Sequence, residues 1–285
     1  MAYHRILYKP HDFTLDEGVI SVSPEVFEEE VKYCKKYFSL IDFQQLKDVL
    51  ESKIILPSNP LIITFDDGYR DNYTYAFPIL KKYNVPATIF LTVDYIGTDR
   101  VFWWDEVSYY MKNSGYYLKE DVDRVLRLLK NMSNKERVKK IEELKNKAKI
   151  ELSVDRQILN WEEIEEMCNN RIEFGSHTMT HPVLSQLKNK DGVTYEIEKS
   201  KEVLEDKLSK EIIAFSYPVG GINAFNEDIK EGVKKAGYYF AVTYTNGINY
   251  LNNGIDRYAL NRLHLDQQSF ARFKAKLAYP QLFKR

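Results

Sequence analysis

The feature that most constrains the fold is a run of five apolar or β-branched residues, Leu61 to Phe65, that leads directly into Asp66, Asp67 and Gly68. An uninterrupted apolar run that ends in turn residues is typical of a strand buried on both faces. In α/β proteins the functional side chains lie where such strands end. Two adjacent carboxylates repel each other, and a cation, a metal or a shared proton would offset the repulsion. A solvated Asp-Asp-Gly turn is the alternative interpretation.

Further apolar strands alternate with amphipathic helices along the chain. Strands are predicted at residues 6–8, 61–65, 86–93, 171–174, 212–215, 238–243 and 258–265. Helices are predicted at residues 24–37, 43–50, 73–83, 160–169, 195–208, 226–236 and 269–277. At least five apolar strands alternating with helices predict an α/β fold with a parallel sheet, closed or nearly closed into a barrel.

A stretch of different character interrupts this alternation at about residues 99–157. It contains no convincing strand and continues in charged helices, one of which begins at a capping box formed by Ser133 and Glu136. The Lys/Glu-rich run at 135–149 is expected to be a solvated helix face. We therefore predict a single domain, residues 1–285, with a helical insertion.

The overall composition excludes several classes of protein. The 41 basic and 42 acidic side chains give a formal charge of −1, which offers no electrostatic case for nucleic acid or an anionic membrane. The two cysteines, Cys34 and Cys168, indicate neither a disulfide framework nor a metal knuckle. The first residues lack the layout of a signal peptide, and no apolar run approaches the roughly 18 to 20 residues of a membrane span. A cytoplasmic protein with no integral membrane segment is the expectation, and its oligomeric state is unknown.

Two histidines lie just beyond the strand predicted at 171–174, in His177-Thr178-Met179-Thr180-His181. Residues four apart share one face of a helical turn, so both imidazoles can reach one ion, and Pro182 limits that helix to a single turn. Two imidazoles and one carboxylate leave a ligand position open for water, as in catalytic sites. The second carboxylate is then free to act as a general base, and the implied reaction is hydrolysis of a carbonyl compound. Two unrelated loop histidines are the alternative.

A third stretch, Phe215 to Asn223, follows the strand predicted at 212–215. Pro and Gly predict a tight turn whose backbone N–H groups are suited to face a developing oxyanion, although most such turns are only connectors. Tyr217, Pro218 and Gly220 in this turn are candidate substrate-binding residues. Trp104 is a fourth candidate, because an aromatic face suits the apolar face of a pyranose ring. The alternative is that Trp104 only seats the helical insertion.

Taken together, the three stretches resemble the successive motifs of the polysaccharide deacetylases, which are the NodB-homology enzymes of carbohydrate esterase family 4. The motifs are Thr64 to Gly68, Ser176 to Pro182 and Phe215 to Asn223, and the resemblance covers roughly residues 62–265. It implies a deformed (β/α)7 barrel and a divalent metal, usually zinc. It also implies metal-dependent removal of an acetyl group from an N-acetylated, sometimes O-acetylated, sugar. The expected partner is an acetylated sugar in a glycan, an oligosaccharide or a glycolipid precursor.

The resemblance also implies roles for individual residues. Asp66 resembles the general base, and Asp67, His177 and His181 resemble the metal ligands. Val219 matches the residue whose backbone N–H helps to hold the oxyanion, a role that survives a change of side chain.

The chain departs from the family pattern in two places. Ser216 stands where the third motif usually carries an arginine that orients the base, and Arg262 is the suggested replacement. The family's last motif provides a histidine that protonates the leaving amine, and His264 is the only late candidate, although it is also consistent with a packed strand histidine. No place at the barrel mouth is predicted for His4 and His11.

Two other functions stay open at this stage. One is hydrolysis of non-sugar amides, such as formamides or cyclic ureides, by the same chemistry. The other is a catalytically silent carbohydrate-binding relative, which the missing arginine suggests.

Overall fold

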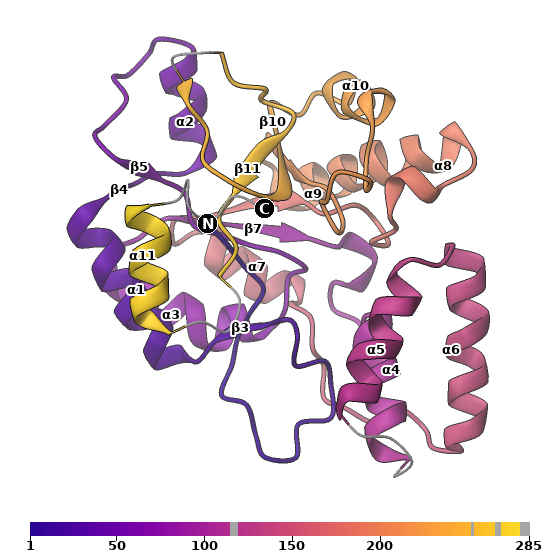
Figure 1. Cartoon of the computed structure of the whole chain (residues 1–285). Helices are drawn as coiled ribbons and strands as arrows, with labels where there is room; N and C mark the ends of the chain where they lie inside the picture. The colour runs from indigo at the N-terminus through magenta and orange to yellow at the C-terminus, as the bar shows by residue number, and fades with distance from the viewer. Residues whose placement is uncertain (115–118, 252–253, 266–268, 280–285) are drawn as a thin grey trace.

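Seven parallel strands form one sheet in the computed structural model, which describes residues 1–114, 119–251, 254–265 and 269–279 (Figure 1). The spatial order of the strands is β1 (Ala2–Tyr3), β6 (Thr64–Phe65), β7 (Ala87–Leu91), β8 (Ile172–Ser176), β9 (Ala214–Ser216), β10 (Phe240–Asn246) and β11 (Leu260–Arg262). The two edges of the sheet meet where Ala2 forms a parallel bridge with His264. The N–H of Ala2 donates there to the carbonyl of Leu263 at 2.9 Å. The sheet is therefore a nearly closed barrel, which confirms the predicted deformed (β/α)7 architecture.

Helices surround this barrel on its outer face (Figure 1). They are α1 (Pro24–Tyr37), α2 (Phe43–Leu50), α3 (Phe77–Tyr83), α7 (Trp161–Cys168), α8 (Lys190–Thr194), α9 (Ser200–Leu208), α10 (Glu227–Lys235) and α11 (Phe270–Ala278). Single π-helical turns at Asn72–Ala76 and Tyr195–Lys199 precede α3 and α9. The capping box predicted at Ser133 is present, and the helix predicted at 160–169 begins at a second box, formed by Asn160 and Glu163, so these helix starts follow from local sequence.

Apolar side chains from the strands and the helices form the core. Strand β7 is buried along its whole length, as a strand covered on both faces must be. Helix α1 presents Phe27, Val31 and Cys34 to the barrel at helical spacing, and all three are at most 1% exposed. Each large apolar side chain buried in this way stabilises the fold by roughly 1.5–3 kcal/mol. This packing holds the strand ends that carry the polar groups described below.

Two of the predicted strands are wrong in position. The first barrel strand is Ala2–Tyr3, whereas Arg5–Ile6 forms β2 and pairs with β3 (Ile20–Val22) outside the barrel. The run at 61–65 is not one strand. It divides into β5 (Pro60–Leu61), which pairs with β4 (Ser39–Leu40), and β6, which pairs with β1 and β7. A single apolar run thus serves two different sheets, and periodicity alone cannot show the division.

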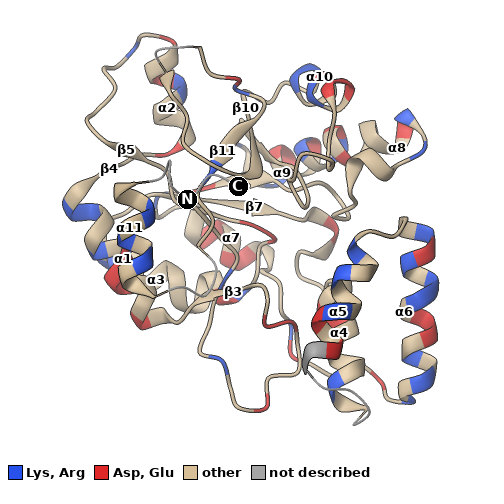
Figure 2. Ribbon diagram, in the orientation of Figure 1, with Lys and Arg blue, Asp and Glu red and all other residues tan. Residues whose placement is uncertain are grey.

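Three helices form the insertion between β7 and β8: α4 (Trp103–Asn113), α5 (Lys119–Lys130) and α6 (Asn134–Ala148). They lie together at one side of the barrel and share a small apolar core that includes Val107, Met111 and Ile141 (Figure 1). Charged residues run along α5 and α6 (Figure 2), and most of those on α6 are exposed. The single-domain organisation stays a prediction. In the part of the chain that the structure describes, no helix is both long and apolar enough to cross a membrane.

Candidate metal centre and active site

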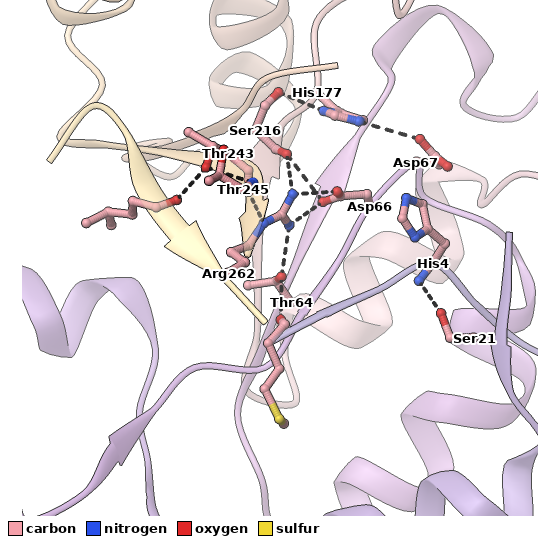
Figure 3. Close-up of polar contacts among 12 residues, drawn as sticks. His4, Ser21, Thr64, Asp66, Asp67, His177, Ser216, Thr243, Thr245 and Arg262 are labelled. Atoms are coloured by element: carbon pink, nitrogen blue, oxygen red, sulfur yellow. Dashed lines mark hydrogen bonds and ion pairs between the residues drawn. The ribbon is translucent and has the colours of Figure 1, made fainter. Parts of the chain in front are cut away.

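The carboxyl ends of β6 and β8 bring one carboxylate and two imidazoles together. Asp67 Oδ1 lies 3.5 Å from His177 Nε2 and 3.4 Å from His181 Nε2. The three donor atoms lie within 4.8 Å of one another. Asp67 and His177 are each 2% exposed. Separate segments of the sequence, more than 100 residues apart, therefore converge on one buried point (Figure 3).

The loop that carries the two histidines is not the helical turn that their spacing predicted. Residues 177–181 form an open bend, in which Thr178 and His181 have positive φ angles of 71° and 61°. The Glu196 carboxylate accepts the N–H groups of Met179 and Thr180, each at 2.9 Å, and so replaces helical hydrogen bonds. The helical-turn prediction was wrong because this distant carboxylate organises the loop. Asp67 also has a positive φ of 74°, and such strained backbone clusters at functional sites.

The protonation of His177 suits a metal ligand. Its Nδ1 lies 2.7 Å from the carbonyl oxygen of Ser216, which leaves Nε2 directed at Asp67 (Figure 3). Burial lowers the pKa of His177 to about 4, so the ring is neutral near pH 7, as metal binding requires. The donor set of two imidazole nitrogens and one carboxylate oxygen fits a divalent ion such as zinc.

Asp66 is held by Arg262 in a bidentate ion pair. The Arg262 Nη1 and Nη2 atoms lie 2.8 and 2.7 Å from the two carboxylate oxygens, and both residues are nearly fully buried (Figure 3). Burial alone would raise the pKa of Asp66, but the adjacent guanidinium outweighs it and holds the pKa below its usual range. Ser216 lies against both partners, 3.2 Å from Arg262 and 3.4 Å from Asp66. A guanidinium thus reaches Asp66 from β11 although the third motif lacks its arginine.

A cavity of about 370 Å³ opens over these groups. Its lining residues are His4, Asp16, Gly18, Val19, Asp66, Asp67, Trp103, Trp104, Asp123, Leu126, Arg127, Lys130, His177, His181, Tyr217, Val219 and Tyr244. Of the four candidate substrate-binding residues, Tyr217 and Trp104 are in this lining, and Pro218 and Gly220 are not.

The turn after β9 presents a strained backbone to the cavity. Val219 has a φ of 66°, which is rare for a β-branched residue, and its N–H donates to no other residue that the structure describes. Gly220, also at positive φ, approaches β10 so closely that a Cβ would lie 2.4 Å from the Tyr244 nitrogen. The turn therefore requires glycine at that position, and it leaves the Val219 N–H available to a ligand.

The structure brings one unpredicted histidine to the cavity. His4 follows β1 directly, and its ring lies beside Asp66 and Asp67 (Figure 3). His264 is not among the lining residues, and its ring is stacked on Tyr244 with a centroid separation of 3.6 Å. His4 was not predicted at the cavity, because the first strand was expected at residues 6–8. Only the two-residue pair Ala2-Tyr3 signals the true strand, and that pair is too short to recognise.

A buried polar cluster joins the helical insertion to the candidate metal site. The Tyr69 hydroxyl donates to Asp105 Oδ2 at 2.9 Å and accepts from Trp104 Nε1 at 2.8 Å. Asp105 is fully buried, and this burial raises its pKa to about 7. The Trp104 ring also packs edge-to-face on His181 at 5.0 Å. Trp104 therefore both anchors the insertion on the barrel and lines the 370 Å³ cavity over the candidate metal ligands, which is called the metal cavity below.

A buried Asp-His-His cluster beside an ionised carboxylate, at the carboxyl edge of a parallel barrel, is the arrangement of a barrel hydrolase. The polysaccharide deacetylase family model matches residues 54–241, which is more than half of the chain. The chain belongs to this family, and the resemblance inferred from the three motifs is confirmed.

Individual relatives agree with this assignment. The chain is 27% identical over 205 residues to the putative polysaccharide deacetylase YxkH of Bacillus subtilis, covering 72% of this chain and 51% of that protein. It is 36% identical over 90 residues to a poly-β-1,6-N-acetyl-D-glucosamine N-deacetylase of Staphylococcus aureus, covering 31% of this chain and 30% of the relative. The chain therefore spans about half or less of the length of these curated relatives.

Solved structures share the fold over nearly the whole chain. The deacetylase PplD of Streptococcus pyogenes, in complex with acetate, has a TM-score of 0.67 at 22% identity, covering 97% of this chain and 96% of that one. IcaB of Ammonifex degensii has a TM-score of 0.64 at 18% identity, covering 98% and 95% of the two chains.

Proposed function

We propose that this chain is a metal-dependent hydrolase that removes N-acetyl groups from a sugar in a glycan, an oligosaccharide or a glycolipid precursor. One observation carries the proposal: the Asp67, His177 and His181 donors converge beside Asp66, which Arg262 keeps ionised, and all of them except Arg262 line one cavity. Three ligands with an open position, next to a free base, are the components that metal-assisted hydrolysis needs.

Three groups around the cavity have catalytic roles in this proposal. Asp66 accepts the proton of the attacking water, and the ion pair with Arg262 keeps it deprotonated. The Val219 N–H donates to the oxygen that gains negative charge when the acetyl carbonyl is attacked. His4 gives a proton to the leaving nitrogen, because its ring lies at the cavity and that of His264 is stacked on Tyr244.

Asp67, His177 and His181 would hold the divalent ion, for which zinc is the expected identity. A divalent ion bound there supplies Lewis-acid chemistry, since it polarises a carbonyl oxygen and lowers the pKa of water. The carbonyl oxygen of Ser216 keeps the His177 ring in the orientation that ligation needs.

The relative from Staphylococcus aureus suggests where to look for the substrate. Because that relative is a poly-β-1,6-N-acetyl-D-glucosamine N-deacetylase, β-linked N-acetylglucosamine oligosaccharides are the first substrates to test. Removal of an acetyl group exposes an amine that becomes cationic near neutral pH, which changes the charge of the glycan.

The test compares the purified protein with its Asp66→Asn variant. The native protein should contain about one divalent ion per chain and release acetate from the oligosaccharide. The variant should keep the ion and lose turnover by about a thousandfold, because a general base contributes roughly 10²–10⁴ in rate. Full activity in Asp66→Asn would refute the base assignment. A formamide and a cyclic ureide in the same panel test the non-sugar alternative, and sugar binding without turnover of any substrate would indicate a silent relative.

A further inference from the structure

A second cavity, of about 460 Å³, lies between the insertion and the loop that carries His181. Trp103 and His181 line this cavity and the metal cavity alike, so the two cavities adjoin at these residues. Two arginines, Arg100 and Arg137, line the second cavity. A glycan whose acetyl group reaches the metal site can therefore extend into a space that contains two cations.

Arg137 is buried without a counter-charge. It is 4% exposed, its Nη2 donates to Asn134 Oδ1 at 3.0 Å, and its guanidinium lies over the Trp103 ring at 5.0 Å. No carboxylate in the described ranges forms an ion pair with it. Burial of an unpaired cation is costly, and an aromatic face offsets only part of that cost. The cavity side of Arg137 is thus suited to an anion, which a guanidinium can bind through two parallel N–H groups.

Arg100 is the second cation of this cavity and comes from the loop between β7 and α4. Its guanidinium lies over the Tyr95 ring at 4.2 Å, and Nη1 makes a long hydrogen bond to the Asp94 carbonyl at 3.4 Å. It also hydrogen-bonds the Tyr95 side chain. Arg100 is exposed and, like Arg137, forms no ion pair with any residue the structure describes.

The two acidic residues of the same cavity, Glu106 and Glu142, have partners of their own. Glu106 hydrogen-bonds the Tyr110 side chain and interacts with Lys145, and Glu142 accepts from Asn146 within α6. Glu106 thus has a cation nearby within the insertion, whereas neither arginine forms an ion pair with a described carboxylate. The two guanidinium groups therefore remain available to an anionic ligand.

We propose that Arg100 and Arg137 form a subsite for an anionic group, a phosphate or a carboxylate, on the sugar next to the one that is deacetylated. The inference rests on the proposed deacetylase function and specifies its substrate class. The glycan passes from the metal cavity across Trp103, and its anionic group binds the two guanidinium groups.

The test uses three N-acetylglucosamine oligosaccharides of equal length: one neutral, one with a single phosphate monoester and one with a single carboxylate. Acetate release gives kcat and KM for each. The native protein should prefer one anionic sugar over the neutral sugar by about tenfold in kcat/KM. The preference should appear mainly as a lower KM, because charge-assisted hydrogen bonds from the guanidinium groups add binding energy. Which anionic sugar is preferred identifies the anion. Equal kcat/KM for all three overturns the proposal.

Variants locate the effect. Arg137→Gln and Arg100→Gln should each lower the ratio of anionic to neutral kcat/KM several-fold, whereas Lys139→Gln, at an exposed lysine on α6, should leave it unchanged. Arg100 is exposed, so its variant remains informative if Arg137→Gln does not fold. An unchanged ratio in Arg100→Gln, or equal losses on all three sugars, overturns the subsite.

A binding measurement separates this proposal from the proposed function. If no sugar releases acetate, the deacetylase function fails, and calorimetric titration with the same three oligosaccharides then decides the subsite. Tighter binding of an anionic sugar, lost in Arg100→Gln, supports the subsite, and equal binding overturns it.

Discussion

The carboxyl edge of the barrel and the helical insertion use charged residues in opposite ways. At the barrel edge, Asp66, Asp67 and Arg262 are each at most 4% exposed and are compensated by contacts from several strands. Charged residues run along α5 and α6 (Figure 2), and most of them are exposed. Their ion pairs are local: Arg124 pairs with Asp121 within α5, and Lys140 pairs with Glu143 within α6. Exposed pairs of that kind contribute about 0–1 kcal/mol each, whereas a buried pair broken on one side costs roughly 3–5 kcal/mol.

Charged residues with a chemical role are therefore expected where they are buried and shift one another's pKa values. At the barrel edge two different causes lower two pKa values. The guanidinium of Arg262 lowers the pKa of Asp66, which keeps that carboxylate an anion, and burial lowers the pKa of His177, which keeps that imidazole neutral. On the insertion the charges mainly keep the helices solvated. Asp105 and Arg137 are instead buried where the insertion meets the barrel. Three charged residues of α5 line the cavity over the candidate metal site: Asp123, Arg127 and Lys130.

Removal of a metal ligand should have the largest effect. In His181→Ala the bound divalent ion should be lost and kcat/KM should fall by at least about a thousandfold, because one of three ligands is absent. Elemental analysis and acetate release from the N-acetylglucosamine oligosaccharide measure the two effects. His11→Ala, at an exposed histidine outside the cavity lining, is the control and should retain both. Retention of the ion and of activity by His181→Ala would show that the convergence of donors has no role in metal binding.

Replacement of Arg262 by Gln should have the next largest effect, a fall in kcat/KM of about a hundredfold near neutral pH. The Asp66 pKa is depressed by Arg262, so without it burial raises that pKa and the base becomes protonated. The loss should therefore be greatest at low pH and should shrink as pH rises. The acid limb of the pH profile of kcat/KM reports this shift in pKa. Arg262→Lys keeps the cation but not the bidentate contact, so its acid limb should lie between those of the native protein and Arg262→Gln. An acid limb that does not move would contradict the role assigned to Arg262.

The two histidines at opposite ends of the chain test the proton donor. His4→Gln should lower kcat by roughly 10- to 100-fold without loss of metal, since His4 lies at the cavity beside Asp66. His264→Gln should change kcat by less than about threefold, since its ring is stacked on Tyr244. Steady-state kinetics and metal content for both variants distinguish them. The reverse ranking would restore His264, the residue first inferred from the sequence.

The sequence predicted those parts of the site whose signal is local. The Asp66-Asp67-Gly68 turn and the spacing of His177 and His181 each combine a strand end with donor side chains, and the structure brings these residues together. The helices capped by Ser133 and Asn160 were predictable for the same reason, because a capping box depends on residues three apart.

What could not be predicted depends on long-range pairing. Strand β1 has two residues, so neither its place in the barrel nor the position of His4 can be inferred from periodicity. The bend at His181 depends on Glu196, 15 residues further along the chain. Arg262 could only be suggested, since its contact with Asp66 joins residues 196 apart.

Asp105, at the junction of the two regions, should affect turnover least and stability most visibly. Its carboxyl pKa is raised to about 7 by burial, so the folded protein keeps the proton over a range where the unfolded chain, with a pKa of about 3.9, has lost it. The free energy of unfolding should therefore fall as pH rises from about 4 to 7. Asp105→Asn resembles the protonated acid in shape, and between pH 5 and 8 it should lose about 2–3 kcal/mol less stability than the native protein. Urea unfolding at pH 5 and at pH 8 measures the free energy of unfolding of each protein. Asp155→Asn, at an exposed aspartate, is the control. Equal losses of stability in the native protein and both variants would show that Asp105 is ionised throughout.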